Sequence, residues 1–336
     1  MVRGEIEKEG TVNIEKAETT KCAKGKPLQR FFAYAVERHK IYLRRKAQQP
    51  APYTTDEILQ RYRFTNVFRE LDKTTVWFRE NVRDRMRDET DVLLATVVFR
   101  MLNRIATGEA IFNQTSLHPI KAYEYVENTT AFDLFCEDGD VRHLKRAIKA
   151  YCGKGPYVTG AYIITSPPGY TKLDGMMQVI KQFYSIPCPD KLCGYEDWEC
   201  VAKSLLKTKT GTLQRTWEWL KDRSYIGPFH AYEIVTDLRH TALLCNAVDI
   251  LSWANPGPGA RRGLNRIHGR DVSDHSAKRE QLIEEMQSVL SASKTLWPKG
   301  KLWPKWEMRE VEHTLCEFDK FERVRLGQGR PRGVFK

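Results

Sequence analysis

The chain has 336 residues and carries 55 Lys and Arg against 43 Asp and Glu, a formal net charge of +12 at pH 7. This length suffices for a sizeable core in one large or two modest lobes. A basic excess that runs through the whole chain favours a polyanionic partner, and charge that serves only solubility is the alternative. No apolar run is long enough to span a membrane, which excludes an integral helical membrane protein.

The compartment follows from the N-terminus and the cysteines. The first residues are too polar for a signal peptide. Eight irregularly spaced cysteines in such a chain indicate reduced thiols rather than disulfides. We therefore expect a cytoplasmic protein, in a host cytoplasm if it is encoded by a phage, without a membrane partner.

The domain organisation is expected to be simple. Residues 1–26 predict a flexible polar arm, 27–326 a helical domain of two lobes, and 327–336 a flexible basic tail. Helical patterns follow one another along the chain. The predicted fold class is therefore all-α, with a cleft between the two lobes.

Two helices are predicted in the N-terminal quarter. The first begins at Leu28 and carries an apolar and aromatic stripe through LQRFFAYAVERHKIYLRRKA. The second begins after the capping sequence at 54–57, bends near Asn66 and continues in helical phase through FTNVFRELDKTTVWFREN. Asn66, Arg69 and Asp72 would then lie one turn apart on one face, which is either functional or a solvated polar face.

The rest of the chain also has helical patterns. Residues 91–105 are apolar nearly all round, which predicts a central buried helix closed near Gly108. Residues 154–168 are expected to form a loop with a short extended piece, because no nearby segment alternates to pair with them. Further helices are predicted at 120–127, 141–151, 172–184, 197–208, 211–223, 280–293 and 306–323.

The stretch 224–263 carries the strongest local signals for a site. The Ile-Gly-Pro sequence at Gly227 predicts a tight turn that leads into a helix. Free N–H groups and the helix dipole at such a start favour a phosphate, and an ordinary turn between core helices is the alternative. Downstream, Asp249 precedes a basic loop at 255–263, whose Pro-Gly-Pro-Gly run should not lie inside a helix.

This stretch resembles the helix-hairpin-helix DNA glycosylases in part. The matching residues are Tyr-Ile-Gly-Pro, with the glycine at Gly227, and Asp249 in register. The resemblance implies a glycosylase-like fold in which the hairpin binds a DNA phosphate. It also implies that the aspartate lies beside a flipped base in a central cleft.

Three longer segments together resemble another family. They are FFAYAVERHKIYLRR with YTTDEILQRYRFTNVFRELDKTT, then WANPGPGARRGLNR, and VEHTLCEFDKFER near the C-terminus. The family is the α-glutamyl/putrescinyl-thymine pyrophosphorylases, which include phage amino acid:DNA transferases and share a helical module with 5-hydroxymethyluracil DNA kinases. The resemblance extends over nearly the whole chain.

That resemblance implies thymine hypermodification. The enzyme would replace the pyrophosphate of 5-pyrophosphoryloxymethyluracil in DNA by an amine, from an amino acid or a polyamine, and release pyrophosphate. The sequence has no G-x-x-x-x-G-K-[S/T] loop of the kind that a kinase would use, which favours the transfer step. A glycosylase acting on a modified pyrimidine and a non-catalytic DNA-binding partner of a hydroxymethyluracil DNA kinase are the alternatives.

Such a reaction would need cations for the leaving group and contacts to DNA, with base flipping or a single-stranded substrate giving access to the base. Each candidate arginine is as well suited to a phosphate-backbone or surface role. The candidates for pyrophosphate are Arg38, Arg45, Arg69, Arg261 and Arg262. The candidates for DNA contact are Gly227, Phe229, Asn66, Arg44, Asn255, Gly257 and Gly259.

The incoming amine must also lose a proton. Asp249 is the first candidate for the general base, by its register, and Glu37 and Asp72 are the second. Cys316, one turn from His313, suggests instead a thiolate that adds to C6 of the pyrimidine. A cysteine that merely fills core space is the alternative.

The sequence predicts no metal site. Cys188, Cys193 and Cys200 lack the C-x-x-C spacing of a zinc site and a nearby fourth ligand. Mg²⁺ would suit the oxygens of a pyrophosphate, but no pair of carboxylates marks a place for it. We therefore expect no certain cofactor, with Mg²⁺ as the one candidate.

Overall fold

The computed structural model describes residues 26–113, 118–121, 124–126, 129–160, 165–185, 198–207, 211–331, 333 and 334. Over these ranges the fold is all-α, as predicted, apart from one short hairpin of β1 (His118–Lys121) and β2 (Glu124–Val126). The predicted arm at 1–26 lies, except for its last residue, outside the described residues.

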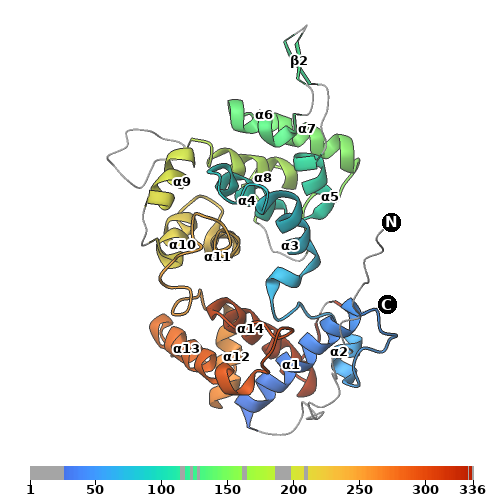
Figure 1. The fold of residues 1–336 in the computed structure, drawn as a ribbon, viewed down its shortest axis with the longest axis vertical. Helices are drawn as coiled ribbons and strands as arrows, with labels where there is room; N and C mark the ends of the chain where they lie inside the picture. Colours follow the sequence, from blue (N-terminus) through green and yellow to red (C-terminus); the bar gives the residue numbers. More distant parts are fainter. Residues whose placement is uncertain are drawn as a thin grey trace, which may run out of the picture.

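The helices form two groups, one above the other in Figure 1. The N-terminal and C-terminal parts of the chain come together in the lower lobe, and the middle of the chain forms the upper lobe. The lower lobe contains α1 (Pro27–Lys46), α2 (Glu57–Arg61), α12 (Pro258–His268), α13 (Arg279–Leu296) and α14 (Met308–Arg325). The upper lobe contains α3 (Lys73–Phe78), η3 (Arg79–Arg83), α4 (Asp91–Leu102), α5 (Ile105–Gly108), η4 (Glu109–Asn113), α6 (Ala131–Asp138), α7 (Val141–Cys152), α8 (Lys172–Lys181), α9 (Trp198–Lys207), α10 (Leu213–Lys221) and α11 (Gly227–Leu238).

The core of each lobe follows from its sequence pattern. Helix α4 is buried from Val92 to Leu102, as its apolar composition predicts, and it packs against α11. In the lower lobe α12 lies closely along α14 because two of its residues are glycines. A Cβ at Gly263 would lie 2.4 Å from the carbonyl oxygen of Leu315, so the two backbones touch there.

The predicted helix from residue 57 to 81 is wrong in its middle. Helix α2 ends at Arg61, and after the extended segment 62–68 only the short 3-10 turn η2 (Arg69–Leu71) precedes α3. Side chains take the place of helical partners in this segment. The backbone N–H of Thr65 donates to Glu317, and that of Asn66 donates to Asp72 at 2.9 Å.

Three further expectations differ from the structure. Of the helix expected at 120–127, residues 120–121 and 124–126 lie instead in the strands of the β1–β2 hairpin. The expected loop at 255–263 is half helix, because Gly257 is extended and Pro258 starts α12 with its fixed φ. The tail is not free throughout, since the N–H of Arg63 donates to the carbonyl oxygen of Gly333 at 2.9 Å.

A candidate active site

A group of charged side chains joins the two lobes. We call Arg69, Glu233, Arg309 and Glu312 the junction cluster. Arg309 Nη2 lies 2.5 Å from Glu233 Oε1, and Arg69 pairs with the other oxygen of the same carboxylate. Arg309 Nη1 lies 3.2 Å from Glu312 Oε2. The cluster therefore connects α14 in the lower lobe, α11 in the upper lobe and the segment between α2 and α3.

One face of α14 supplies much of this site, because residues three and four apart lie side by side on a helix. The helix starts with a reciprocal cap, in which Glu310 accepts from the N–H of Glu307. From there the polar residues recur at helical spacing and contact α11, α12 or the 64–72 segment. They are Arg309, Glu312, His313, Cys316, Glu317 and Lys320.

Burial sets the protonation states within the cluster. Arg309 and Arg69 hold the pKa of Glu233 well below its usual value despite a large opposing effect of burial, so this carboxylate is ionised. Burial raises the pKa of Glu312 to about 7, and Arg309 only partly offsets this. Glu312 is thus a carboxyl group that changes charge near neutral pH. Such a group is suited to accept and return a proton.

The environment of Glu312 includes the start of α12. A Cβ at Gly257, the residue that caps this helix, would lie 3.5 Å from Glu312 Oε1. A Cβ at this distance would make an ordinary van der Waals contact, so Gly257 lies directly beside the carboxylate. This places one predicted residue, Gly257, next to a residue that sequence reasoning missed.

The segment 64–72 closes over α14 through side-chain contacts. Thr65 Oγ1 lies 2.6 Å from His313 Nε2, and the N–H of Thr65 donates to Glu317 at 3.1 Å. Asp72, which accepts from the N–H of Asn66, is also 3.5 Å from Arg69. Sequence reasoning grouped Asn66, Arg69 and Asp72 correctly, although a folded loop rather than a helix brings them together.

His313 and Cys316 do not form the pair that a thiolate would need. Burial, with Arg69 and Arg309 nearby, holds the pKa of His313 well below its usual value, so the imidazole is neutral. Burial also raises the pKa of Cys316 to about 12. The thiol packs on α12, since a Cβ at Gly259 would lie 2.2 Å from its Sγ. The structure thus gives both Cys316 and Gly259 a packing role, whereas the sequence analysis suggested a nucleophile and a DNA contact.

Asp249 has a structural set of partners. Its two carboxylate oxygens accept from the backbone N–H groups of Leu213 and Gln214, at 2.7 and 2.9 Å. These are the first N–H groups of α10, which have no partner within the helix. The carboxylate that register suggested as a general base thus stabilises a helix start.

The turn at Gly227 has the geometry that the sequence predicted. Gly227 has φ +62°, and α11 starts there with Pro228 in its first turn. Tyr225 and Phe229 on either side are 44% and 48% exposed. Asn255 reaches this turn, because its Nδ2 donates to the carbonyl oxygen of Pro228 at 3.3 Å. Two aromatic rings and a helix start therefore face solvent together.

The remaining predicted arginines and Glu37 occupy three places. Arg44 pairs with Glu37 at 2.9 Å, so that carboxylate is an ion-pair partner on α1. Arg262 pairs with Asp319 at 2.8 Å and remains 37% exposed, and Arg261 donates to the carbonyl oxygen of Ala277 at 2.8 Å. Arg38 and Arg45 line a pocket of their own, described below.

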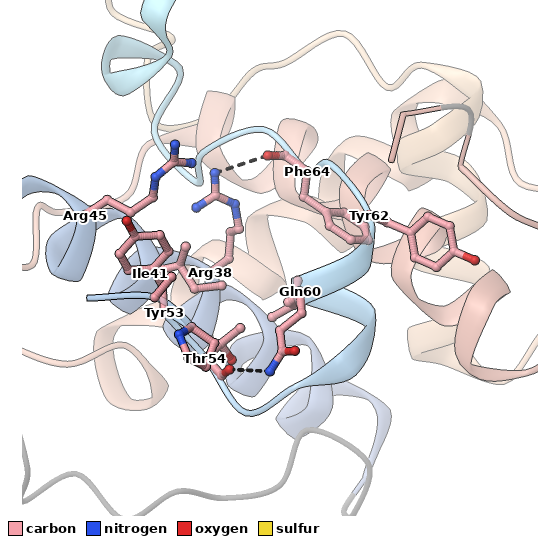
Figure 2. Close-up of a pocket in the computed structure, with 11 residues that line it drawn as sticks. Arg38, Ile41, Arg45, Tyr53, Thr54, Gln60, Tyr62 and Phe64 are labelled. Carbon is pink, nitrogen blue, oxygen red and sulfur yellow. Dashed lines mark hydrogen bonds between the residues drawn. The ribbon is translucent and has the colours of Figure 1, made fainter. Parts of the chain in front are cut away.

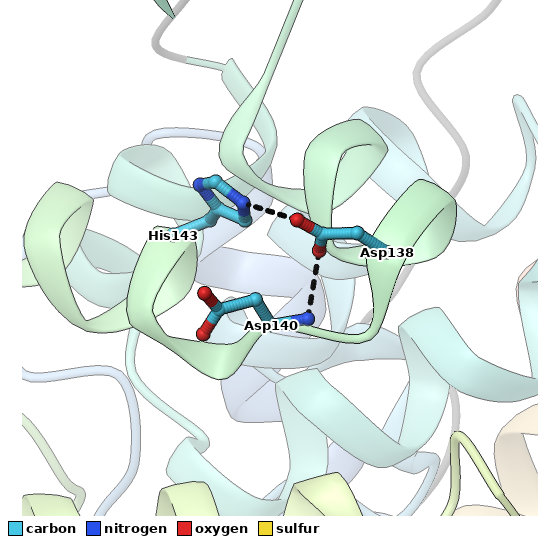
Figure 3. A group of neighbouring side chains, drawn as sticks. All are labelled: Asp138, Asp140 and His143. Atoms are coloured by element: carbon cyan, nitrogen blue, oxygen red, sulfur yellow. Dashed lines mark hydrogen bonds and ion pairs between the residues drawn. The ribbon is translucent and has the colours of Figure 1, made fainter. Parts of the chain in front are cut away.

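One group of described residues has the spacing of a metal site. Figure 3 shows Asp138, Asp140 and His143 at the turn between α6 and α7. Their hydrogen bonds account for the arrangement: Asp140 caps α7, and Asp138 accepts from the N–H of Asp140 and pairs with His143 at 2.9 Å. Cys188 and Cys193 lie outside the described residues. No helix in the described ranges has both the length and the apolar character of a membrane span.

Glu312 is not among the residues predicted from the sequence. Glu312 lies within the quoted segment VEHTLCEFDKFER, but a glutamate on a helix gives no sign of burial by itself. Its partners Glu233 and Arg309 are distant in sequence from Arg69. The signal that could have been read is the recurrence of polar residues at helical spacing along 309–320.

Comparisons with known proteins match most of the chain. A family model described as "5-hmdU DNA kinase, helical domain" matches residues 26–330. A 5-hmdU DNA kinase of Bacillus phage SP10 is 25% identical over 256 residues, which cover 70% of this chain and 35% of that kinase. The chain thus spans about a third of that relative. No solved structure matches.

Proposed function

Since the chain belongs to the family of 5-hmdU DNA kinase helical domains, which its model matches over residues 26–330, we propose that it acts in thymine hypermodification of DNA. The reaction that we propose is the transfer step. An amine, from an amino acid or a polyamine, displaces the pyrophosphate of 5-pyrophosphoryloxymethyluracil in DNA. The carbon–nitrogen bond forms as the carbon–oxygen bond to pyrophosphate breaks, and the amine nitrogen loses one proton.

The observation that carries this proposal is Glu312 in the junction cluster. A buried carboxyl with a pKa of about 7 can take the proton that the attacking amine must lose. Arg309 lies 3.2 Å from it and stabilises the carboxylate form. The neutral His313, which contacts Thr65 at 2.6 Å, fixes the 64–72 segment over the same face of α14.

The turn at Gly227 is the proposed contact to DNA. Its helix start offers N–H groups to a backbone phosphate, and the exposed rings of Tyr225 and Phe229 offer surfaces on which bases stack. Asn255 supports the turn from the following loop. A flipped base would have its exocyclic carbon accessible to both amine and enzyme.

A non-catalytic role is the second candidate, and one observation favours it. The phage relative has nearly two thirds of its length outside the match, since the match covers 35% of it. In that case the helical domain would bind DNA for a kinase encoded elsewhere. A glycosylase has less support, because the carboxylate of Asp249 is occupied by two N–H groups of α10.

The test uses DNA that carries 5-pyrophosphoryloxymethyluracil and a panel of amino acids and polyamines. We expect pyrophosphate release and a new aminated nucleoside, measured by mass spectrometry. Glu312→Gln should slow single-turnover release by about 100-fold or more, as for other acid–base groups.

Glu310→Gln is the matched control. Glu310 is a second glutamate on α14 whose pKa burial raises to about 7, but its role is to cap the helix, which glutamine also does. Release at the wild-type rate by Glu312→Gln would contradict the assignment. DNA binding without any pyrophosphate release would favour the non-catalytic role, and abasic sites would indicate a glycosylase.

A further inference from the structure

A pocket of about 430 Å³ opens between α1 and the segment that carries α2. Figure 2 shows how its residues lie, with the side chains of Arg38 and Arg45 on one side and Tyr53 near Arg45. Its walls are mostly apolar or aromatic, and the polar side chain of Gln60 lines one side. The apolar and aromatic residues that form these walls include Ile41, Leu59, Tyr62 and Phe64.

Arg38 is the unusual residue of this pocket. Arg38 is 9% exposed, and its Nη1 has no hydrogen-bond partner among the described residues. Nη2 donates to the carbonyl oxygen of Phe64 at 3.1 Å and to Asn66 Oδ1 at 2.8 Å. Neither acceptor carries a charge. Burial lowers the pKa of Arg38, because removing a guanidinium from water disfavours its charged form. No carboxylate is hydrogen-bonded to Arg38 among the contacts above, so the charge is unfavourable where it lies.

Arg45 adds a second positive charge at the edge of the same pocket. Its guanidinium carbon lies 5.6 Å from the ring centre of Tyr53, which orients it by a cation–π contact. Arg45 is exposed and lies at the rim of the pocket, whereas Arg38 is buried. A ligand that meets both would insert one anionic group past the rim.

The pocket is connected to Asp72 and to α14 through two consecutive residues. Asn66, which accepts from Arg38, is held by Asp72 through its own N–H at 2.9 Å. Thr65, the residue before it, contacts His313 on α14 at 2.6 Å. A group bound at Arg38 would therefore be coupled to the segment that closes over the proposed acid–base residue.

We propose that this pocket binds a small molecule through an oxyanion, and that this molecule is the amine donor, bound by its carboxylate. Two arginines match one carboxylate, because Nη1 of Arg38 has no partner among the described residues and Arg45 adds a second guanidinium at the rim. Pyrophosphate has the same oxyanion chemistry, but it carries several charges and no apolar part for these walls. The identification of the ligand as the donor rests on the proposed function, whereas the oxyanion site itself does not.

Equilibrium binding tests the pocket without any turnover. Isothermal titration calorimetry of the full chain would use glycine, L-glutamate, putrescine and inorganic pyrophosphate as separate ligands, without DNA. We expect an amino acid to bind and putrescine, which has no carboxylate, to bind at least 10-fold more weakly. Arg38→Met should weaken amino-acid binding at least 10-fold.

The matched control is Arg61→Met. Arg61 lies on α2 with its guanidinium 5.5 Å from the ring centre of Tyr62, but it does not line the pocket. Its replacement should leave affinity unchanged. Circular dichroism of Arg38→Met checks folding, and Arg45→Met at the exposed rim gives a second variant that reports on the same site.

The outcomes separate the pocket from the reaction. Binding of pyrophosphate alone, lost in both Arg38→Met and Arg45→Met, would support the oxyanion site and overturn the donor as its ligand. Binding of none of the four ligands, or binding that neither variant changes, would overturn the site. An amino acid that binds in an Arg38-dependent way, with no transfer to modified DNA, would support the pocket while contradicting the proposed function.

Discussion

Arg309 on α14 and Glu233 on α11 form an ion pair of 2.5 Å that joins the two lobes, and both side chains are almost fully buried. Arg69 shares the same carboxylate from the segment between α2 and α3. A carboxylate with two guanidinium partners is stable in such a place only while both remain. The junction therefore depends on three parts of the chain that are far apart in sequence.

Loss of Arg309 should be among the most destabilising changes to the protein. Arg309→Met removes one guanidinium from the buried carboxylate of Glu233, and we expect the free energy of unfolding to fall by about 3–5 kcal/mol. Chemical denaturation followed by circular dichroism measures this. Arg142→Met is the control, because Arg142 is exposed and its pair with Asp140 should contribute less than about 1 kcal/mol. Equal effects of the two changes would contradict a structural role for the junction.

The pH dependence of stability should show the raised pKa of Glu312. A carboxyl whose pKa rises on folding, here to about 7, binds its proton more tightly in the folded state. Its contribution is fully present below its unfolded pKa and is lost as pH rises towards 7. The free energy of unfolding of the wild type should fall over this range relative to that of Glu312→Gln, which has no proton to lose. A constant difference between the two proteins from pH 4.5 to 7.5 would contradict the raised pKa.

Gly259 should not tolerate a side chain. A Cβ there would lie 2.2 Å from Cys316 Sγ and 3.2 Å from its Cα, so Gly259→Ala must separate α12 from α14. Alanine favours a helix by up to about 1 kcal/mol over glycine, and overpacking of about 1–3 kcal/mol should exceed this gain. Thermal unfolding should give a lower midpoint. Cys316→Ala in the same chain should restore part of the loss. Gly160→Ala, in open space, is the control.

The sequence predicted the elements better than the contacts between them. Helices α1, α4, α7, α13 and α14 lie close to their expected ranges, because each has a strong apolar pattern. The 62–72 segment was missed because its backbone partners are side chains such as Glu317 and Asp72, which no local pattern reveals. The glycines of α12 predict a loop by composition, whereas close packing on α14 is what requires them.

The residues of the candidate site were predictable only where the signal is local in the sequence. Arg69 and Asp72 were found because they are close in sequence, and Gly227 because its turn has a local signature. Glu312 and Glu233 could not be found, because only the fold shows that these charged residues are buried and which partners they have.

Substitutions of Asp249 distinguish a structural role of this residue from a catalytic one. Its carboxylate accepts from two N–H groups at the start of α10, so Asp249→Ala should lower the free energy of unfolding by about 0.5–2 kcal/mol. Pyrophosphate release by Asp249→Asn, measured in single turnover below the unfolding temperature, should stay near the wild-type rate. A loss of about 100-fold with intact stability would restore Asp249 as the general base.

The exposed ring of Phe229 should contribute to DNA affinity and not to stability. Phe229 is 48% exposed beside the helix start at Gly227, where a stacked base would cover it. Phe229→Ala should weaken binding of single-stranded DNA by about 1–3 kcal/mol. Added salt should lower the DNA affinity of the wild type and of the variant in parallel, because the phosphate contacts are unchanged. Fluorescence anisotropy over a range of salt concentrations measures both effects.

Tyr170→Ala is the matched control, because Tyr170 is equally exposed at 49% but lies in the turn before α8, outside the proposed DNA contact. If both variants lost the same affinity, a general effect of exposed aromatic residues would explain the result. If Phe229→Ala bound DNA as the wild type does, the turn at Gly227 would have no role in stacking, and Tyr225 alone could not support the proposed contact. A selective loss in Phe229→Ala, with an unchanged unfolding midpoint, is the result that the geometry of this turn requires.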